Sequence, residues 1–216
     1  MGQLILTFLK MFFRNPRAWF FVIFLPSGLF AIAAFMSLES IIRTDLQVSY
    51  QDFLLVGIIS MALMQTGLYT VGYLFIDYRK SQILKQLSIT PLTGGKFIFA
   101  QIISRFLIAC LQVAALLAVG AAAFGVWVQD LLILPIFIFL GNTLFLFLGI
   151  IIAAFSRSYE EAAPYTTVIG LPLVFLGDVF FPTKGLPSFL EAVANYLPLK
   201  PLSAILRHFS LGLPDP

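Results

Sequence analysis

The chain has 216 residues, of which 60% are hydrophobic and 11% are charged, and its formal net charge is +3. A soluble domain carries about 25% charged residues, so this composition excludes an ordinary soluble domain and indicates a membrane protein. The basic residues lie beside apolar stretches, as they do in cytoplasmic loops of membrane proteins, and this argues against nucleic-acid binding.

The first predicted element is an interfacial amphipathic helix over residues 1–16. Its apolar side chains would lie in the membrane interface while Lys10 and Arg14 face lipid phosphates. A basic start before an apolar run also resembles a secretory signal, but the pattern favours an uncleaved interfacial helix.

Five apolar stretches follow that are long enough to cross about 30 Å of hydrocarbon. Their predicted bounds are 17–37, 53–76, 97–124, 131–155 and 163–181. The fold class expected is therefore all-α, a polytopic bundle of transmembrane helices that forms a single domain over residues 1–216.

The loops between these spans differ in charge. Residues 39–52 hold three carboxylates and one arginine, whereas residues 77–96 hold Arg79, Lys80, Lys85 and Lys96. Because basic loops stay inside, residues 77–96, the N-terminus and the short 156–161 loop are predicted to be cytoplasmic. The expected localisation is the cell inner (plasma) membrane, multi-pass, with a cytoplasmic N-terminus.

A hairpin is predicted after the fifth span, over residues 182–198. Prolines prevent a continuous helix there, and the apolar stretch 188–197 is too short to cross the bilayer. We expect a re-entrant or interfacial hairpin, because lipid cannot satisfy non-helical backbone. Its candidate residues are Phe181, Pro182, Pro187 and Pro198.

Several polar residues lie inside the spans. The second span carries four polar residues that could line a path or hydrogen-bond a neighbouring helix, and packing is slightly favoured. They are Gln65, Thr66, Tyr69 and Thr70, with Gln65 and Tyr69 spaced i, i+4. Arg105 is expected to extend to the inner head groups rather than to lie along a substrate path. Because these polar residues are isolated, no catalytic constellation is predicted.

Other chemical sites are not supported. Cys110 is the single cysteine, and the short Cys/His spacings that hold zinc are absent, so no metal site is predicted. The Gly94-Gly95-Lys96 sequence lacks the earlier glycine and the following Ser or Thr of a phosphate-binding loop. No nucleotide site is therefore predicted in this chain.

The basic stretch over residues 78–91 is the most informative segment. Its apolar residues fall on one helical face and its basic and amide residues mostly elsewhere, and Pro91 would end the helix. Such a helix would lie at the cytoplasmic surface, where lipid head groups or a protein are equally suitable partners. The residues concerned are Arg79, Lys80, Gln82, Ile83, Leu84, Lys85 and Leu87.

Five short patterns occur in a characteristic order. They are Arg14-Asn15-Pro16 with aromatic residues after it, Ser88-Ile89-Thr90-Pro91-Leu92, the pair Glu160 and Glu161, Leu176-Gly177 through Phe181-Pro182, and Leu197-Pro198-Leu199 ahead of Leu206-Arg207. In this order and spacing, the chain resembles the membrane subunit of an ABC transporter of the type-2 exporter permease family.

This resemblance implies a membrane permease subunit of an ATP-driven exporter that forms its translocation path as a homodimer or with a related permease. Residues 79–87 would be the coupling helix that contacts a cytoplasmic ABC ATPase subunit, and the loop with Glu160 and Glu161 would be a second contact. The hairpin would cap the path on the extracellular side. ATP and Mg²⁺ would bind to the partner, so the chain itself would hold no cofactor and would not be an enzyme.

The sequence leaves three points open: the number of spans, the cargo and an alternative function. The family usually has a sixth span after the Leu206-Arg207 position, and the sequence stops shortly beyond it, so that span is expected to be missing. A drug, a lipid or a glycan would suit the path equally well as cargo. The alternative to a permease is a non-transport integral membrane enzyme or an assembly factor.

Overall fold

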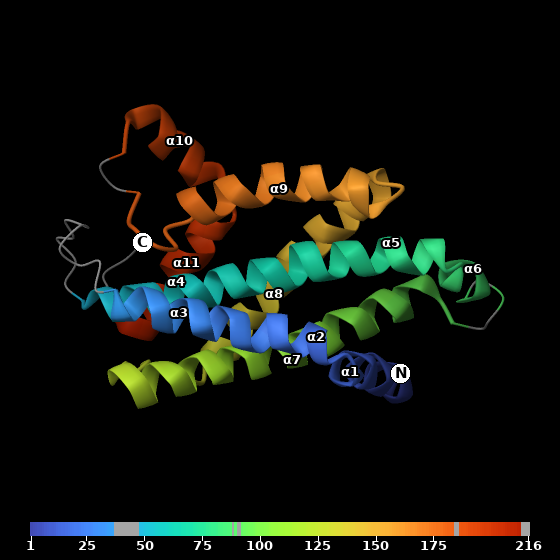
Figure 1. The fold of residues 1–216 in the computed structure, drawn as a ribbon, viewed down its shortest axis with the longest axis horizontal. Coiled ribbons are helices and arrows are strands. Elements are labelled where there is room, and N and C mark those ends of the chain that lie inside the picture. Colours follow the sequence, from blue (N-terminus) through green and yellow to red (C-terminus); the bar gives the residue numbers. More distant parts are fainter. Residues whose placement is uncertain (37–47, 88, 90–91, 184–185, 213–216) are drawn as a thin grey trace.

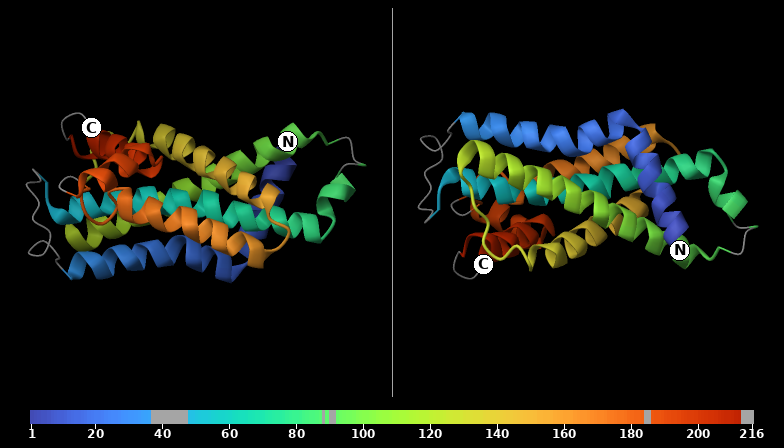
Figure 2. Two further views of the ribbon diagram at one scale, coloured as in Figure 1. Left: turned by 90° about the horizontal axis from the view of Figure 1, so that it is seen from above. Right: turned by 90° about the horizontal axis from the view of Figure 1, so that it is seen from below.

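The computed structural model describes residues 1–36, 48–87, 89, 92–183 and 186–212, and all regular elements in these ranges are helices (Figure 1). Long antiparallel helices form an elongated bundle. The N-terminus, α6 and the turn between α8 and α9 lie at one end, and α10 and α11 lie at the other (Figures 1 and 2). The predicted acidic loop falls mostly on residues 37–47, outside the described ranges.

The N-terminal part contains a short helix and a first long helix that meet at Asn15. Helix α1 (Gly2–Arg14) packs against α7, burying Phe8 and Phe12. Asn15 then caps the next helix, since its side chain accepts a hydrogen bond from the Ala18 amide, and Pro16 supplies the favoured first helical position. Helices α2 (Pro16–Trp19), η1 (Phe20–Phe24) and α3 (Leu25–Phe35) follow without a break, and η1 is π-helical.

The second long helix lies in the centre of the bundle. It comprises α4 (Tyr50–Gln65), the π-helical segment η3 (Thr66–Val71) and α5 (Gly72–Lys80). Ser49 caps its N-terminus by accepting a hydrogen bond from the Asp52 amide. In its most apolar window, 83% of the residues are buried inside the protein, so this helix is surrounded by the others.

The remaining long helices pack around this central one. Helix α7 (Gly94–Phe124) ends at Gly125, whose φ of +66° is the left-handed conformation that glycine adopts easily. Helix α8 (Leu134–Phe155) crosses η3 closely: a Cβ atom on Gly67 would lie 2.6 Å from the Leu146 nitrogen. The missing side chain is therefore what allows these two helices to approach.

Four helices among the described residues are long and apolar enough to cross a membrane: Pro16–Phe35, Tyr50–Lys80, Gly94–Phe124 and Leu134–Phe155. They correspond to the first four predicted spans, and the chain is a multi-pass membrane protein. The predicted fifth span lies in α9 (Tyr159–Leu176), which is not among the four. Two glutamates in its first turn and two internal prolines lower its mean hydropathy.

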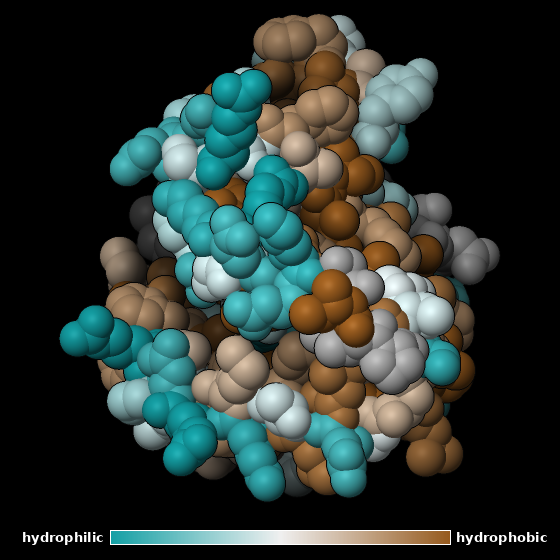
Figure 3. Space-filling view, turned by 90° about the vertical axis from the view of Figure 1, so that its right-hand side faces the viewer, coloured by the Kyte–Doolittle hydropathy of each residue, from teal (hydrophilic) through white to brown (hydrophobic). Residues whose placement is uncertain are grey.

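The last described elements are short. Helix α6 (Ile83–Leu87) follows α5 after a turn, and helices α10 (Ser188–Tyr196) and α11 (Leu199–Leu211) lie at the opposite end of the bundle (Figure 1). Helix α11 packs against α4. Hydrophilic side chains gather on the end of the bundle that carries α6 (Figure 3).

Candidate functional site

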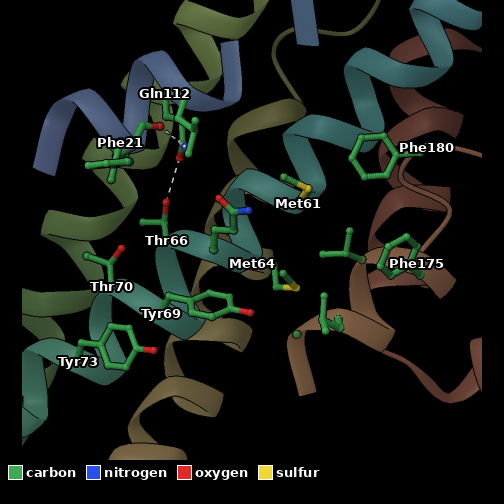
Figure 4. A pocket seen from close by; sticks show the side chains of 16 residues that line it. Phe21, Met61, Met64, Thr66, Tyr69, Thr70, Tyr73, Gln112, Phe175 and Phe180 are labelled. Carbon is green, nitrogen blue, oxygen red and sulfur yellow. Dashed lines mark hydrogen bonds between the residues drawn. The ribbon is translucent and has the colours of Figure 1, made fainter. Parts of the chain in front are cut away.

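A cavity of about 790 Å³ lies beside the middle of the central helix, between η1 and α3 on one side and α9 on the other (Figure 4). Sixteen described residues line it, and none of them carries a formal charge at neutral pH. The volume is in the range of small-molecule sites, which are mostly apolar with a few placed polar groups. This cavity is the first candidate site.

Gln65 and Tyr69 both lie on the cavity wall. Thr66 and Thr70, named with them from the sequence, line it as well, and Tyr73, which lies four residues after Tyr69, had not been named. In an α-helix, positions 65 and 70 would point in different directions, but the i→i+5 bonding of η3 brings residues five apart close together. The π-helical segment therefore brings the Thr70 side chain closer to the face that carries Gln65.

Gln112 of α7 joins the two π-helical segments at the edge of the cavity. Its Nε2 donates to the Val22 carbonyl at 2.6 Å, and its Oε1 accepts from the Thr66 hydroxyl at 3.0 Å (Figure 4). The Val22 carbonyl cannot accept an α-helical bond from residue 26, because Pro26 has no N–H, and lipid cannot supply another partner. Gln112 supplies that partner and fixes η1 relative to η3.

Replacing Gln112 by leucine is expected to lower the free energy of unfolding by about 1–3 kcal/mol, because two buried polar groups lose their partner. Thr66→Val removes one of the same bonds. The double variant should therefore lose less stability than the sum of the single changes, by at least about 0.5 kcal/mol. A double-mutant cycle from unfolding in lipid nanodiscs measures this difference, and strict additivity would contradict the bridging role.

A second cluster lies where α5 meets the turn between α8 and α9. Arg79 Nη1 donates to the Ser156 carbonyl at 3.0 Å, and its Nη2 donates to the Ala153 carbonyl at 2.9 Å. The last carbonyls of a helix have no partner within the helix and carry partial negative charge, so a guanidinium there is favourable. Arg79 thus clamps the C-terminus of α8 to α5.

A continuous chain of contacts runs from this cluster to the cavity. Lys80 Nζ lies 5.0 Å from the centre of the Tyr159 ring, and that ring contacts Tyr73 at 5.6 Å between centroids. The Tyr73 hydroxyl lies 3.2 Å from Thr166 Oγ1, and the Tyr69 hydroxyl donates to the Thr166 carbonyl at 3.2 Å. The central helix and α9 are therefore joined from the polar end of the bundle up to the cavity.

Tyr159 also lies beside Asp77. Partial burial raises the pKa of the Tyr159 phenol, and the neighbouring Asp77 carboxylate raises it further. Both effects favour the neutral form of the phenol, whose ring lies beside the Lys80 ammonium group.

The predicted coupling helix over residues 78–91 is not continuous. Helix α5 ends at Lys80, and Gln82 adopts a φ of 59° in the turn before α6. Ile83 and Leu84 pack against a buried cluster that includes Tyr78 and Phe97, while Lys85 is exposed. The Leu87 side chain and residues 88 and 90–91 lie outside the described part.

Glu160 and Glu161 lie in the first turn of α9, where they take part in its cap. Ser158 accepts a hydrogen bond from the Glu161 amide, and Glu161 Oε2 accepts one from the Arg157 amide at 2.7 Å. The Ser158 hydroxyl donates to Glu160 Oε2. Both side chains are exposed. Their hydrogen bonds at the start of α9 are sufficient to explain why acidic residues occur there, without a partner subunit.

The chain is similar in sequence to a known family and to several bacterial proteins. Residues 3–209 match the family described as ABC-2 type transporter. The chain belongs to the ABC-2 type transporter family. The resemblance inferred from the sequence patterns is thereby confirmed.

Relatives of this ABC-2 permease come from several bacteria. It is 28% identical over 169 residues to nodulation protein J of Rhizobium leguminosarum bv. trifolii, covering 77% of this chain and 64% of that protein. It is 24% identical over 172 residues to the inner membrane transport permease YadH of Escherichia coli K12, covering 77% and 65%. For the putative transport permease YvfS of Bacillus subtilis strain 168, the identity is 23% over 194 residues, covering 86% and 76%. The chain thus spans just under two thirds of the length of nodulation protein J and of YadH.

The residues of the predicted hairpin lie at the end of the bundle opposite α6 (Figure 1). Phe181, Pro182 and Pro198 are half-buried, and Pro187 precedes α10 as its N-terminal flanking residue. Residues 184–185 lie outside the described part. Among the described residues of the segment, the regular element is the short helix α10.

Arg207 of α11 anchors this end; it was part of the Leu206-Arg207 pattern in the sequence but was not named as a site residue. It is 5% exposed, its guanidinium lies 3.6 Å from the centre of the Phe53 ring, and it donates to the Asp178 carbonyl. Burial lowers the pKa of Arg207 to about 9, and the Asp178 carboxylate opposes that shift, so the side chain is a cation at neutral pH. Asp178 Oδ1 in turn accepts from the Thr183 amide.

Arg105 is 7% exposed, so the expectation that it extends to the lipid head groups does not agree with its position. It lies on α7 one turn from Gln101, which is also buried and donates to the Tyr78 hydroxyl. The cation is held inside the bundle, near α5.

Within the described residues, no group of His, Cys, Asp and Glu could hold a metal ion.

Proposed function

We propose that this chain is the membrane permease subunit of an ATP-driven exporter. Two copies, or this chain with a related permease, would form the translocation path. A separate cytoplasmic ABC ATPase subunit would bind ATP and Mg²⁺ and carry out hydrolysis. The observation that carries this proposal is the chain of contacts from Arg79 and Lys80 through Tyr159 and Tyr73 to the cavity.

The proposed orientation in the membrane places the end with α6 in the cytoplasm. Hydrophilic side chains gather at that end (Figure 3), and the basic residues of the sequence are concentrated in the same segments. The membrane would be the inner membrane, as the name of YadH states for that protein. Helix α1 would lie in the interface, and α9 would be the fifth span.

The hairpin over residues 182–198 would cap the path on the extracellular side. The Arg207 contacts support this proposal, since they hold the start of the segment against α4. Helix α10 exposes Phe189 and Tyr196, which would suit the lipid interface. The cap would therefore be fixed at its base and apolar at its surface.

The second copy would face the cavity. Phe21 and Leu25 on one wall and Leu171 and Phe175 on the other are all at least 48% exposed, although they are large and apolar. A related surface placed across these walls would close the cavity and enclose a path between two permeases.

The mechanism that follows is alternating access. Closure of two ATPase subunits would push on α6 and on the turn between α8 and α9 together, because α6 directly follows α5 and Arg79 joins α5 to that turn. The Tyr73 and Tyr69 contacts with Thr166 would carry that movement to the cavity wall. The movement at the cytoplasmic surface would thereby change the shape of the cavity.

Reversing two charges tests the docking surface. Lys80→Glu together with Lys85→Glu is expected to weaken association with the ATPase subunit at least about tenfold, because complementary charges across an interface would become repulsive. Affinity purification of the permease followed by quantification of bound ATPase measures this. Lys96→Glu, an exposed cation at the start of α7, is the matched control. Retention of full ATPase binding by the double variant would contradict the proposal.

A further inference from the structure

The cavity is divided by polarity along the axis of the central helix. Met61, Phe175 and Phe180 lie toward the end nearer α10, whereas Thr70 and Tyr73 lie toward the end nearer α6 (Figure 4). A ligand that fills the cavity would therefore meet hydroxyl and amide groups at one end and only apolar side chains at the other.

Two of the polar groups are available to a ligand. Thr66 is bonded to α7, and Tyr69 and Tyr73 are bonded to α9. The side chains of Gln65 and Thr70 have no hydrogen-bond partner among the described residues, and both are half-buried on the cavity wall. Polar groups turned toward a low-dielectric space are stabilised when a ligand supplies their hydrogen bonds.

The net charge of the ligand's head group is also constrained. None of the sixteen lining residues is charged at neutral pH. A charged head group moved from water into this space would lose its hydration without gaining a counter-charge, which is costly. An uncharged head group with hydroxyl or amide groups loses little, since Gln65 and Thr70 both donate and accept.

We propose that the cavity binds an uncharged amphiphile. Its hydroxyl- or amide-bearing head group lies between Gln65 and Thr70, and its apolar chain extends along Met64, Met61 and Phe175 toward α10. The inference rests on the proposed transport function for its biological use and names the class of cargo. Binding itself is a separate property and can be measured without ATP.

The test uses the purified full chain in phosphatidylcholine nanodiscs with a fluorescent alkyl glucoside as the bound probe. Octyl glucoside, octyl sulfate and octyltrimethylammonium share a chain length and differ in head-group charge, and each competes for the probe in an anisotropy measurement. Octyl glucoside is expected to displace the probe at concentrations at least about tenfold lower than either charged compound. Equal competition by all three would overturn the proposal.

Variants locate the head group. Gln65→Leu with Thr70→Val is expected to weaken glucoside binding about tenfold, whereas Thr167→Val, which removes an exposed hydroxyl of α9 outside the cavity, should leave it unchanged. Gln65→Glu adds a carboxylate and should reverse the preference toward octyltrimethylammonium. Such a reversal cannot arise from misfolding. Unchanged preference in both cavity variants would overturn the proposal.

Failure of the exporter proposal and failure of the binding proposal give different experimental results. If proteoliposomes with the ATPase subunit show no ATP-dependent flux while the head-group preference and its reversal are both observed, the exporter proposal fails and the binding proposal stands. If flux occurs but charged and neutral compounds compete equally, the binding proposal fails and the exporter proposal stands.

Discussion

Replacing Gly67 by alanine is expected to lower the free energy of unfolding by about 1–3 kcal/mol, because the added methyl group would overlap the backbone of α8. An ideal Cβ on Gly67 lies 2.6 Å from the Leu146 nitrogen and from the Phe145 carbonyl carbon. Backbone atoms cannot rotate away as side chains do, so α8 and η3 would have to separate. Thermal or denaturant unfolding of the purified protein in nanodiscs measures the loss.

The matched control is Gly28→Ala on α3, where the added Cβ would meet no atom within 4 Å beyond its own stretch of helix. A glycine in a helix interior costs about 0.5–1 kcal/mol relative to alanine, so this change should stabilise the protein slightly. The two substitutions are chemically identical and are expected to act in opposite directions. Gly67→Ala without loss of stability would show that the two helices are not in close contact.

The second large effect is expected from Arg79→Ala, which should reduce cargo flux at least about tenfold while ATP hydrolysis by the assembled transporter continues. The change removes both hydrogen bonds to the C-terminus of α8, and bonds from a charged donor contribute roughly 1.5–3 kcal/mol each. Helix α5 and the turn between α8 and α9 would then move independently. Flux and hydrolysis measured in the same proteoliposomes give the ratio that tests this.

Two further variants serve as controls for the Arg79→Ala experiment. Arg79→Lys keeps the charge without the two-pronged geometry and should give an intermediate ratio of flux to hydrolysis. Lys96→Ala removes an exposed cation at the same end of the bundle and should leave that ratio unchanged. A parallel fall of flux and hydrolysis in Arg79→Ala would instead indicate loss of ATPase docking and contradict the clamp.

The membrane spans could be predicted where a continuous apolar stretch of sequence marks them. Long apolar stretches require helices in lipid, and four of the five predicted spans lie in helices with suitable length and composition. The fifth prediction depends on α9, where Pro164, Pro172 and the acidic first turn weaken the same signal. The break at Gln82 was not predictable, because the stretch from Arg79 to Lys85 has a helical pattern of its own.

The candidate site was predictable only in part, for a geometric reason. Gln65 and Tyr69 are spaced as an α-helix requires, and both reach the cavity. Thr70 was likewise among the polar residues of this span that the sequence offered, but no sequence pattern marks η3 as π-helical. Arg79 looked like one of several surface cations, since the carbonyls that it binds, at Ala153 and Ser156, come from a helix more than seventy residues later.

The central position of the second long helix affects how this protein responds to its lipid surroundings. Changes in bilayer thickness act on helices that touch lipid, which adjust by tilting or by local compression of the membrane. In the helix Tyr50–Lys80, 83% of the most apolar window is enclosed by protein, against 28% for Pro16–Phe35 and 33% for Gly94–Phe124. A thinner or thicker membrane should therefore tilt the outer helices first, while the wall that carries Gln65 and Thr70 keeps its form.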